Sequence, residues 1–176
     1  MNIVNSNFRI KNSKFKNNYS DAIDFDFSNG SIENLDFETI GNDALDFSGS
    51  EVLIKKVKFN EIGDKIISVG ENSKIQINEI IGYDSFLGVA SKDGSFVNLD
   101  NIFFDNVKIP LASYNKKKAY DDGFINIQNI DFNNYLVKWI RDKRSKIFFE
   151  NEETGIIQED IISLIYEKNF NSLNYN

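Results

Sequence analysis

Residues 23–59 read IDFDFSNGSIENLDFETIGNDALDFSGSEVLIKKVKF, and the pattern of apolar side chains in this stretch occurs twice at a period of about 22 residues. Ile54 follows Ile32 by one such period, and Phe59 follows Phe37 by the same interval. A fixed period of this length is typical of a small structural unit that is stacked on copies of itself. The repeat is therefore the feature of the sequence that decides the fold.

The period continues on both sides of this stretch, with one extra residue after the third unit and six extra residues after the fifth. Apolar residues recur at equivalent positions of each unit, so we expect them to form columns in one continuous core. The three columns are Ile10, Ile32, Ile54, Ile77, Leu99, Ile127 and Phe149; Val52, Ile75, Val97, Ile125 and Ile147; and Leu35, Val57, Ile80, Ile102 and Ile130.

Apolar and polar residues alternate within each unit, as they do from Ile23 to Phe27 and from Leu45 to Ser48. A period of two predicts strands with one buried face. Each segment between turns has about three to six residues, which is too short for a helix. Three short strands in each unit predict an all-β fold: a right-handed, single-stranded parallel β-helix of about six to seven coils over residues 1–150.

Small polar residues recur where the predicted strands meet. Asparagine tolerates the left-handed backbone conformation of a tight corner, and stacked amides can bond along a column. We therefore expect these residues to shape corners rather than to bind a ligand, although Lys56 and Glu79 interrupt the asparagine series. The series are Asn12, Asn34, Asn101 and Asn129 at one corner, and Ser50, Ser73, Ser95 and Ser145 at another.

The two ends of the repeat differ. The segment Asn2–Ile10 begins in the middle of a unit without an amphipathic helix before it, and an uncovered end exposes strand edges. We expect a missing N-terminal region or another subunit to cover this end. In residues 151–176, apolar positions 157, 161, 164 and 165 have helical spacing, with Glu159 and Asp160 early and Lys168 late. This pattern predicts a helix over about 157–168 that caps the last coil, followed by a frayed tail.

The composition excludes several functions. The chain has 176 residues and contains neither Cys nor His, which excludes disulfides, zinc thiolate sites, cysteine nucleophiles and histidine bases. Its net charge of −7 argues against binding to nucleic acid. No apolar run approaches the ~18 residues of a membrane span. The compartment stays unknown, and it is extracellular or the cell envelope if the chain belongs to an exported protein.

An acidic cluster lies in the first two units. Asp43 follows Asp21 by one period, so the two are expected one coil apart on the outer surface. The same spacing separates Asp24 from Asp46. Carboxylates held this close repel each other, and a bound cation relieves the repulsion; oxygen ligands without His or Cys favour Ca²⁺. The alternative is a solvated acidic face in which Lys65, in the column of Asp43, is the counter-ion.

Four short runs add a resemblance: DALDFSGS at 43–50, IGDK at 62–65, GENS at 70–73 and SKDGS at 91–95. They resemble parallel β-helix modules of the pectate-lyase-like superfamily in bacteria, and the resemblance covers about residues 10–149. Such modules are often appended to larger exported proteins associated with surface polysaccharide. The superfamily includes lyases, hydrolases, epimerases and inert stalks, so the resemblance implies the fold without fixing an activity.

The resemblance implies a catalytic alternative. Lyases and epimerases of uronic acids on this fold combine acidic calcium ligands with a basic residue that removes the C5 proton, and Lys65 or Lys92 would take this role. A lysine base needs a lowered pKa, whereas the neighbouring Asp64 and Asp93 raise it. The few long loops also leave little to wall a cleft.

The six-residue insertion lies within residues 114–122. Its aromatic and basic side chains are candidates for stacking on sugar rings or for holding an anionic glycan, and the alternative is a surface loop without a ligand. Nearby, Trp139 follows Leu111 by one period plus the six inserted residues, which places it in a core column. We therefore expect its side chain to pack in the interior rather than to stack on a sugar. The candidate carbohydrate-binding residues are Tyr114, Lys116, Lys117 and Tyr120.

Three functions remain open at this point. The preferred one is a non-catalytic β-helix scaffold or carbohydrate-contacting module of a bacterial surface or exocellular protein, because the sequence carries no complete set of catalytic residues. The second is a calcium-dependent polysaccharide lyase or uronate epimerase. The third is a homo-oligomerisation module that joins chains through the uncapped N-terminal coil.

Overall fold

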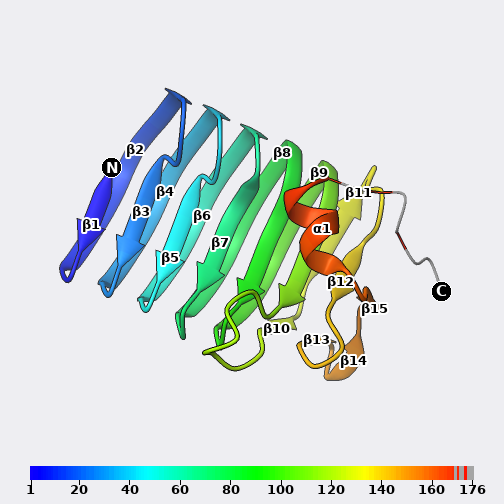
Figure 1. The fold of residues 1–176 in the computed structure, drawn as a ribbon. Helices are drawn as coiled ribbons and strands as arrows, with labels where there is room; N and C mark the ends of the chain where they lie inside the picture. The colour runs from blue at the N-terminus through cyan, green and yellow to red at the C-terminus, as the bar shows by residue number, and fades with distance from the viewer. Residues whose placement is uncertain (169, 171–172, 174–176) are drawn as a thin grey trace.

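A computed structural model describes residues 1–168, 170 and 173. The chain forms a parallel β-solenoid of about seven turns, with one short helix near its C-terminus (Figure 1). This confirms the all-β fold class that the repeat predicts. Strands of successive turns lie side by side along the length of the molecule. Among the described residues, no helix has the length and apolar character that crossing a membrane requires.

In the first turns, a short strand alternates with a longer one that bends at a corner, whereas β8 and β9 each continue through 19 residues. The strands are β1 (Asn2–Val4), β2 (Asn7–Asn18), β3 (Ile23–Asp26), β4 (Asn29–Ile40), β5 (Leu45–Ser48), β6 (Glu51–Ile62), β7 (Lys65–Gly70), β8 (Lys74–Lys92), β9 (Phe96–Tyr114), β10 (Phe124–Ile127), β11 (Ile130–Asn133), β12 (Trp139–Arg141), β13 (Lys146–Phe149), β14 (Glu152–Thr154) and β15 (Ile156–Ile157), and the helix is α1 (Ile161–Tyr166).

The strands pair in the register that the repeat predicts. Ile32 of β4 lies opposite Ile10 of β2 on one side and Ile54 of β6 on the other, so that each strand step corresponds to one period of the sequence. The insertion loops out between β9 and β10, so that Ile125 still lies opposite Val97. The pairings are parallel except that of β13 with β14, which is antiparallel.

The predicted apolar columns form the interior of the solenoid, and their members are fully buried except in the first and last turns. Aromatic rings stack within it: the ring centroids of Phe37 and Phe59 are 5.1 Å apart. Gly82 takes the next position of this phenylalanine column. A Cβ there would lie 2.6 Å from Cδ1 of Ile66 and 2.7 Å from Cδ1 of Phe104, so neighbouring side chains already fill the space.

Left-handed backbone conformations form the corners, as predicted for the asparagine series. Asn12 and Asn34 have φ of 51° and 57°, and the amide of Asn34 donates a hydrogen bond of 2.7 Å to that of Asn12. Asn129 shares the column but does not have a positive φ; its amide donates to Asp100 instead. Two further columns of positive φ are Asn17, Thr39, Glu61, Asp84, Asn106 and Asn134, and Asn5, Phe27, Gly49, Glu71 and Asp93.

The serines form a buried ladder at another corner, which confirms their predicted place. The N–H of Ser28 donates to Oγ of Ser50, and the N–H of Ser50 donates to Oγ of Ser73, both over 3.0 Å. Because backbone donors at these buried corners have no strand partner, the hydroxyl groups satisfy them.

The helix differs from the prediction in length and in position. Residues 156–157 pair with β12 as strand β15, and α1 starts only at Ile161, after its N-cap Asp160. The helix packs on the outer face of β8, β9 and β12 rather than across the end of the last coil (Figure 1). The predicted tail falls mostly outside the described residues. We call the buried patch beneath α1 the apolar strip; it consists of Phe86, Leu87, Ala90, Ile109, Ala112, Val137 and Ile140.

Candidate functional site

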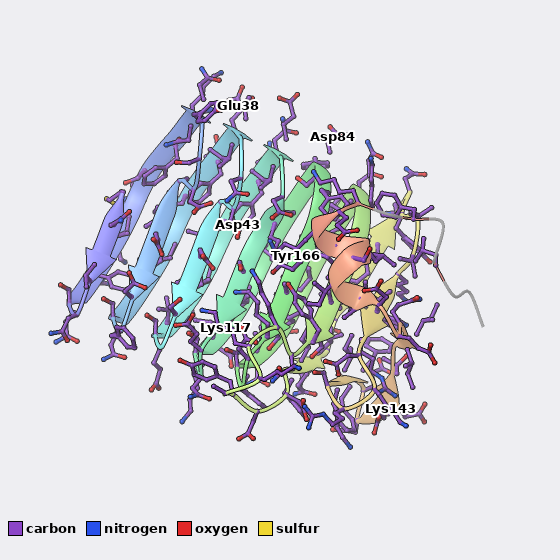
Figure 2. All side chains as sticks on the ribbon, viewed as in Figure 1. Glu38, Asp43, Asp84, Lys117, Lys143 and Tyr166 are labelled. Atoms are coloured by element: carbon purple, nitrogen blue, oxygen red, sulfur yellow. The ribbon has the colours of Figure 1, made fainter. Side chains whose placement is uncertain are left out.

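Six of the predicted site residues come together where the apolar strip ends, at the side of α1 that faces the first turns; Asp21, Asp24, Lys117 and Tyr120 do not. Asp43 and Tyr166 lie near each other there (Figure 2). Acidic, basic and tyrosine side chains contact one another here around Lys65 and Tyr166, and the ion pair of Lys92 with Asp46 lies on the neighbouring strands. We call this group the Lys65 cluster; it consists of Asp43, Asp46, Asp64, Lys65, Lys92, Tyr114, Lys116 and Tyr166.

The acidic residues of the first turns hold the corners of the solenoid. Oδ1 of Asp21 accepts the N–H of Asp43 over 2.9 Å, and Oδ1 of Asp43 accepts the N–H of Lys65 over the same distance. Each carboxylate thus binds the backbone of the next turn. Asp24 lies directly opposite Asp46 on the neighbouring strand, which confirms the spacing of one turn.

Lys65 is buried between carboxylates, and its side chain is only 3% exposed. Its Nζ lies 2.5 Å from Oδ2 of Asp64 and 3.4 Å from Oδ1 of Asp43. The ring of Tyr166 lies on a further side, with its centroid 5.0 Å from Nζ. Lys65 is therefore the counter-ion of the acidic column.

Tyr166 is the residue that sequence reasoning missed. It lies in the last turn of α1, and its hydroxyl is 2.9 Å from that of Tyr114. Nζ of Lys116 lies 4.2 Å from the centroid of the same ring. The ring therefore interacts with the ammonium groups of Lys65 and Lys116, an arrangement that the negative faces of the aromatic system favour. The only sequence signal was the helical spacing, which does not tell which surface a helix covers.

Burial and neighbouring charges raise the pKa values of three members of the cluster. Burial raises the pKa of Asp43 to about 7, although the charge of Lys65 opposes this shift. Burial lowers the pKa of Lys65, but the carboxylates of Asp43 and Asp64 outweigh burial, so that its pKa is raised. Burial, followed by the hydrogen-bonded Tyr166, raises the pKa of Tyr114 well above its usual value. Lys65 therefore stays protonated, which is the opposite of what a lysine base requires.

Lys92 occupies the far side of the cluster. Its Nζ lies 3.9 Å from Oδ1 of Asp46, a buried oxygen atom for which the structure shows no hydrogen-bond partner. Burial, and then repulsion from Asp26 and Asp46, raises the pKa of Asp24. Within the described part of the chain, no three acidic side chains converge closely enough to hold a metal ion.

The insertion differs from the prediction at Tyr114. This side chain is completely buried beneath α1, so its ring has no surface on which a sugar can stack. Oδ1 of Asp93 accepts the N–H groups of Lys116 and Lys117 over 2.7 and 2.6 Å, which fixes the start of the loop. Lys117 also pairs with Glu71. Lys116 and Lys117 are exposed, and Tyr120 at the end of the loop is half-buried.

Trp139 packs as predicted. It lies opposite Leu111 in the strand register, and its side chain contacts the interior of the solenoid. Nζ of Lys138 lies 4.2 Å from the centroid of its ring.

Chemically, the Lys65 cluster is a set of paired charges at the edge of α1. Its charges are matched within the fold, and its buried lysine attaches the helix to the solenoid through Tyr166. The sequence matches no protein-family model, and it has no match among curated proteins or solved structures.

Proposed function

We propose that the chain is a non-catalytic β-solenoid scaffold of a bacterial surface or exocellular protein that contacts carbohydrate on a lateral face. The observation that carries the non-catalytic part is the environment of Lys65, whose ammonium group is buried between Asp43 and Asp64. A lysine held in this way cannot accept a proton from the C5 atom of a uronic acid. Membership of the pectate-lyase-like superfamily is part of the same proposal.

Two observations support contact with carbohydrate. The net charge of −7 disfavours polyanions but not neutral glycans. The turns also carry short loops apart from the insertion, so the outer faces that α1 does not cover are open along the solenoid. The resemblance to modules associated with surface polysaccharide points the same way. Lys116, Lys117 and Tyr120 stay candidates for an additional contact at the insertion.

A lyase and epimerase assay tests the non-catalytic part. Wild-type protein is incubated with polygalacturonate and with alginate, each with Ca²⁺ and with a chelator, and the products are analysed by absorbance and NMR. We expect neither unsaturated ends nor inverted uronate residues. Calcium-dependent product that disappears in Lys65→Met or Lys92→Met would instead establish the enzymatic alternative. A thermal shift with Ca²⁺ that Asp24→Asn and Asp46→Asn abolish would establish the metal site.

A second candidate function, self-association, is favoured by the first turn. Ile10 and Phe15 are half-buried there, whereas their counterparts Ile32 and Phe37 in the next turn are fully buried. A second chain that covers this face would bury them. Light scattering tests this function: a concentration-dependent mass that Phe15→Lys abolishes supports it, and a monomeric mass at all concentrations contradicts it.

A further inference from the structure

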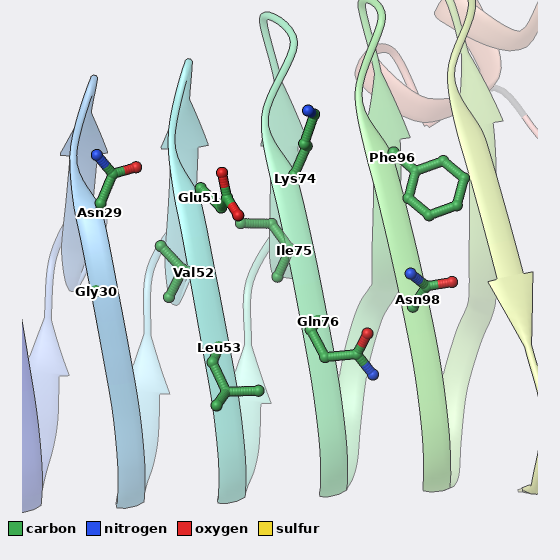
Figure 3. A pocket seen from close by; sticks show the side chains of 10 residues that line it. All are labelled: Asn29, Gly30, Glu51, Val52, Leu53, Lys74, Ile75, Gln76, Phe96 and Asn98. Atoms are coloured by element: carbon green, nitrogen blue, oxygen red, sulfur yellow. The ribbon is translucent and has the colours of Figure 1, made fainter.

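We propose that a shallow groove on the outer face of β4, β6, β8 and β9 binds a neutral polysaccharide, with one sugar ring stacked on Phe96. The inference rests on the proposed function and gives its carbohydrate contact a place. Its lining includes no residue of the Lys65 cluster and none of the insertion, which hold the residues that the sequence singles out. Figure 3 shows its lining side chains on four neighbouring strands.

The strand register builds the groove from two outward-facing columns. One column runs from Glu51 through Lys74 to Phe96, and the adjacent column includes Gln76 and Asn98. Successive members of a column are separated by about 4.8 Å, the spacing of neighbouring strands. A polymer that lies along the solenoid axis therefore meets an equivalent position at every turn.

Phe96 supplies an aromatic surface on β9, the last of the strands that line the groove. Its side chain is 38% exposed, and Figure 3 shows the ring with its face turned toward the viewer. The ring stacks on that of Phe124 with a centroid distance of 4.6 Å and an interplanar angle of 11°, and Phe124 stacks in turn on Phe148. The stack holds Phe96 in place. A sugar ring presents a face of C–H groups, which matches the negative face of an aromatic ring.

The polar side chains of the groove suit hydroxyl groups. The amide nitrogen of Gln76 donates to Asn78 over 3.0 Å, which leaves the carbonyl oxygen of Gln76 to accept. Oδ1 of Asn98 accepts from Asn126 over 3.2 Å, which leaves the amide nitrogen of Asn98 to donate. A hydrogen-bond acceptor on β8 and a donor on β9 thus lie side by side. Because a sugar hydroxyl group both donates and accepts hydrogen bonds, it can bind to either.

Charge selects a neutral polymer. Glu51 and Lys74 lie opposite each other in the register, so the two charges that line the groove cancel. A polyanion would meet the carboxylate of Glu51 and the net negative charge of the whole chain. The ligand class is therefore a neutral polysaccharide rather than a polyuronate.

Affinity electrophoresis in native gels tests the inference. The gels contain soluble mixed-linkage glucan, xylan or galactomannan as neutral polymers, or polygalacturonate as the anionic polymer. We expect at least one neutral polymer to retard the wild type. Phe96→Ala should weaken that affinity about tenfold, because it removes the stacking surface. Phe96→Trp should restore it, and Tyr135→Ala, which removes an aromatic ring that is 43% exposed outside the groove, should leave it unchanged.

The outcomes separate the inference from the proposed function. Equal retardation of the wild type and Phe96→Ala overturns the groove but leaves carbohydrate contact in place. Retardation by polygalacturonate alone overturns the choice of a neutral ligand and the groove with it. If no polymer retards the wild type, both the groove and the carbohydrate-contacting function are wrong. Thermal unfolding of each variant shows whether a lost affinity reflects a lost fold.

Discussion

The outer face of a single sheet has a charged half and an apolar half, and the two halves differ in what covers them. In the first turns, one outward column carries Asp24 and Asp46; in later turns, the same column carries Ala90 and Ala112. The helix α1 covers only the later turns. Inward-facing positions therefore repeat because every turn shares one core, whereas outward-facing positions change with the contacts of each turn.

The largest expected effect comes from placing a charge in the covered half. Ile109 is fully buried in the apolar strip, and Ile109→Asp would leave a carboxylate without a partner beneath α1. We expect the free energy of unfolding, measured in urea, to fall by about 4–5 kcal/mol.

Ile81→Asp is the control, because Ile81 is 38% exposed on a part of β8 that α1 does not cover. It should cost less than about 1 kcal/mol. Similar losses in the two variants would show that α1 does not cover Ile109.

Removing the lysine at the boundary of the two halves should cost somewhat less. Lys65→Met leaves Asp43 buried without its counter-ion, so we expect a loss of about 3 kcal/mol in urea unfolding. Lys14→Met is the matched control, because Lys14 pairs with Asp36 and Glu38 on an exposed surface. Its effect should be within the error of the measurement. A comparable change in both variants would contradict the special role of the buried lysine.

The buried carboxyl of Asp43, where the charged and apolar halves meet, should also make the free energy of unfolding depend on pH. Because the pKa of Asp43 is raised to about 7, the folded state keeps this proton over a range in which the unfolded state has released it. The contribution is complete below about pH 4 and is lost as the pH rises through about 7. Between pH 5 and pH 8, the wild type should lose about 2–3 kcal/mol relative to Asp43→Asn. A difference that is constant over this range would show that Asp43 titrates normally.

The smallest effect on stability is expected for exposed ion pairs, such as those of Glu38 with Lys14 and Lys16. Hydrogen bonds from Lys16 and Lys14 lower the pKa of Glu38 to about 2. The stabilising contribution of this carboxylate is present at neutral pH and is lost as the pH falls through about 2. An NMR titration should find this value at low salt and a value closer to that of a free glutamate at high salt. A pKa that salt does not change would contradict pairing at the surface.

The fold was predictable because it depends on the inward columns. Period and alternation identify positions such as Ile32 and Ile54 directly, and a register of one period per turn follows from them. The corner at Thr39 and Glu61 was not predictable, because their left-handed conformations are imposed by the turns rather than indicated by residue type.

The candidate site was predictable only in part. The spacing of Asp24 and Asp46 identified neighbours on one face, and the spacing of Asp43 and Lys65 identified their pairing. The position of α1 could not be derived, because an amphipathic pattern shows that a helix has an apolar face but not which surface it meets. Tyr166 and the burial of Tyr114 depend on that position, so the sequence could not indicate either of them.

The most direct test of this account is an NMR measurement of contacts between the rings of Tyr114 and Tyr166. Their centroids are 6.4 Å apart if α1 packs on the outer face of the solenoid, and we predict nuclear Overhauser effects between their ring protons. Contacts of Tyr166 with the interior of the last coil, for example with Ile147 or Phe149, in place of contacts with Tyr114 would show that the helix caps the end. That result would contradict the division of the outer face into a covered half and a charged half.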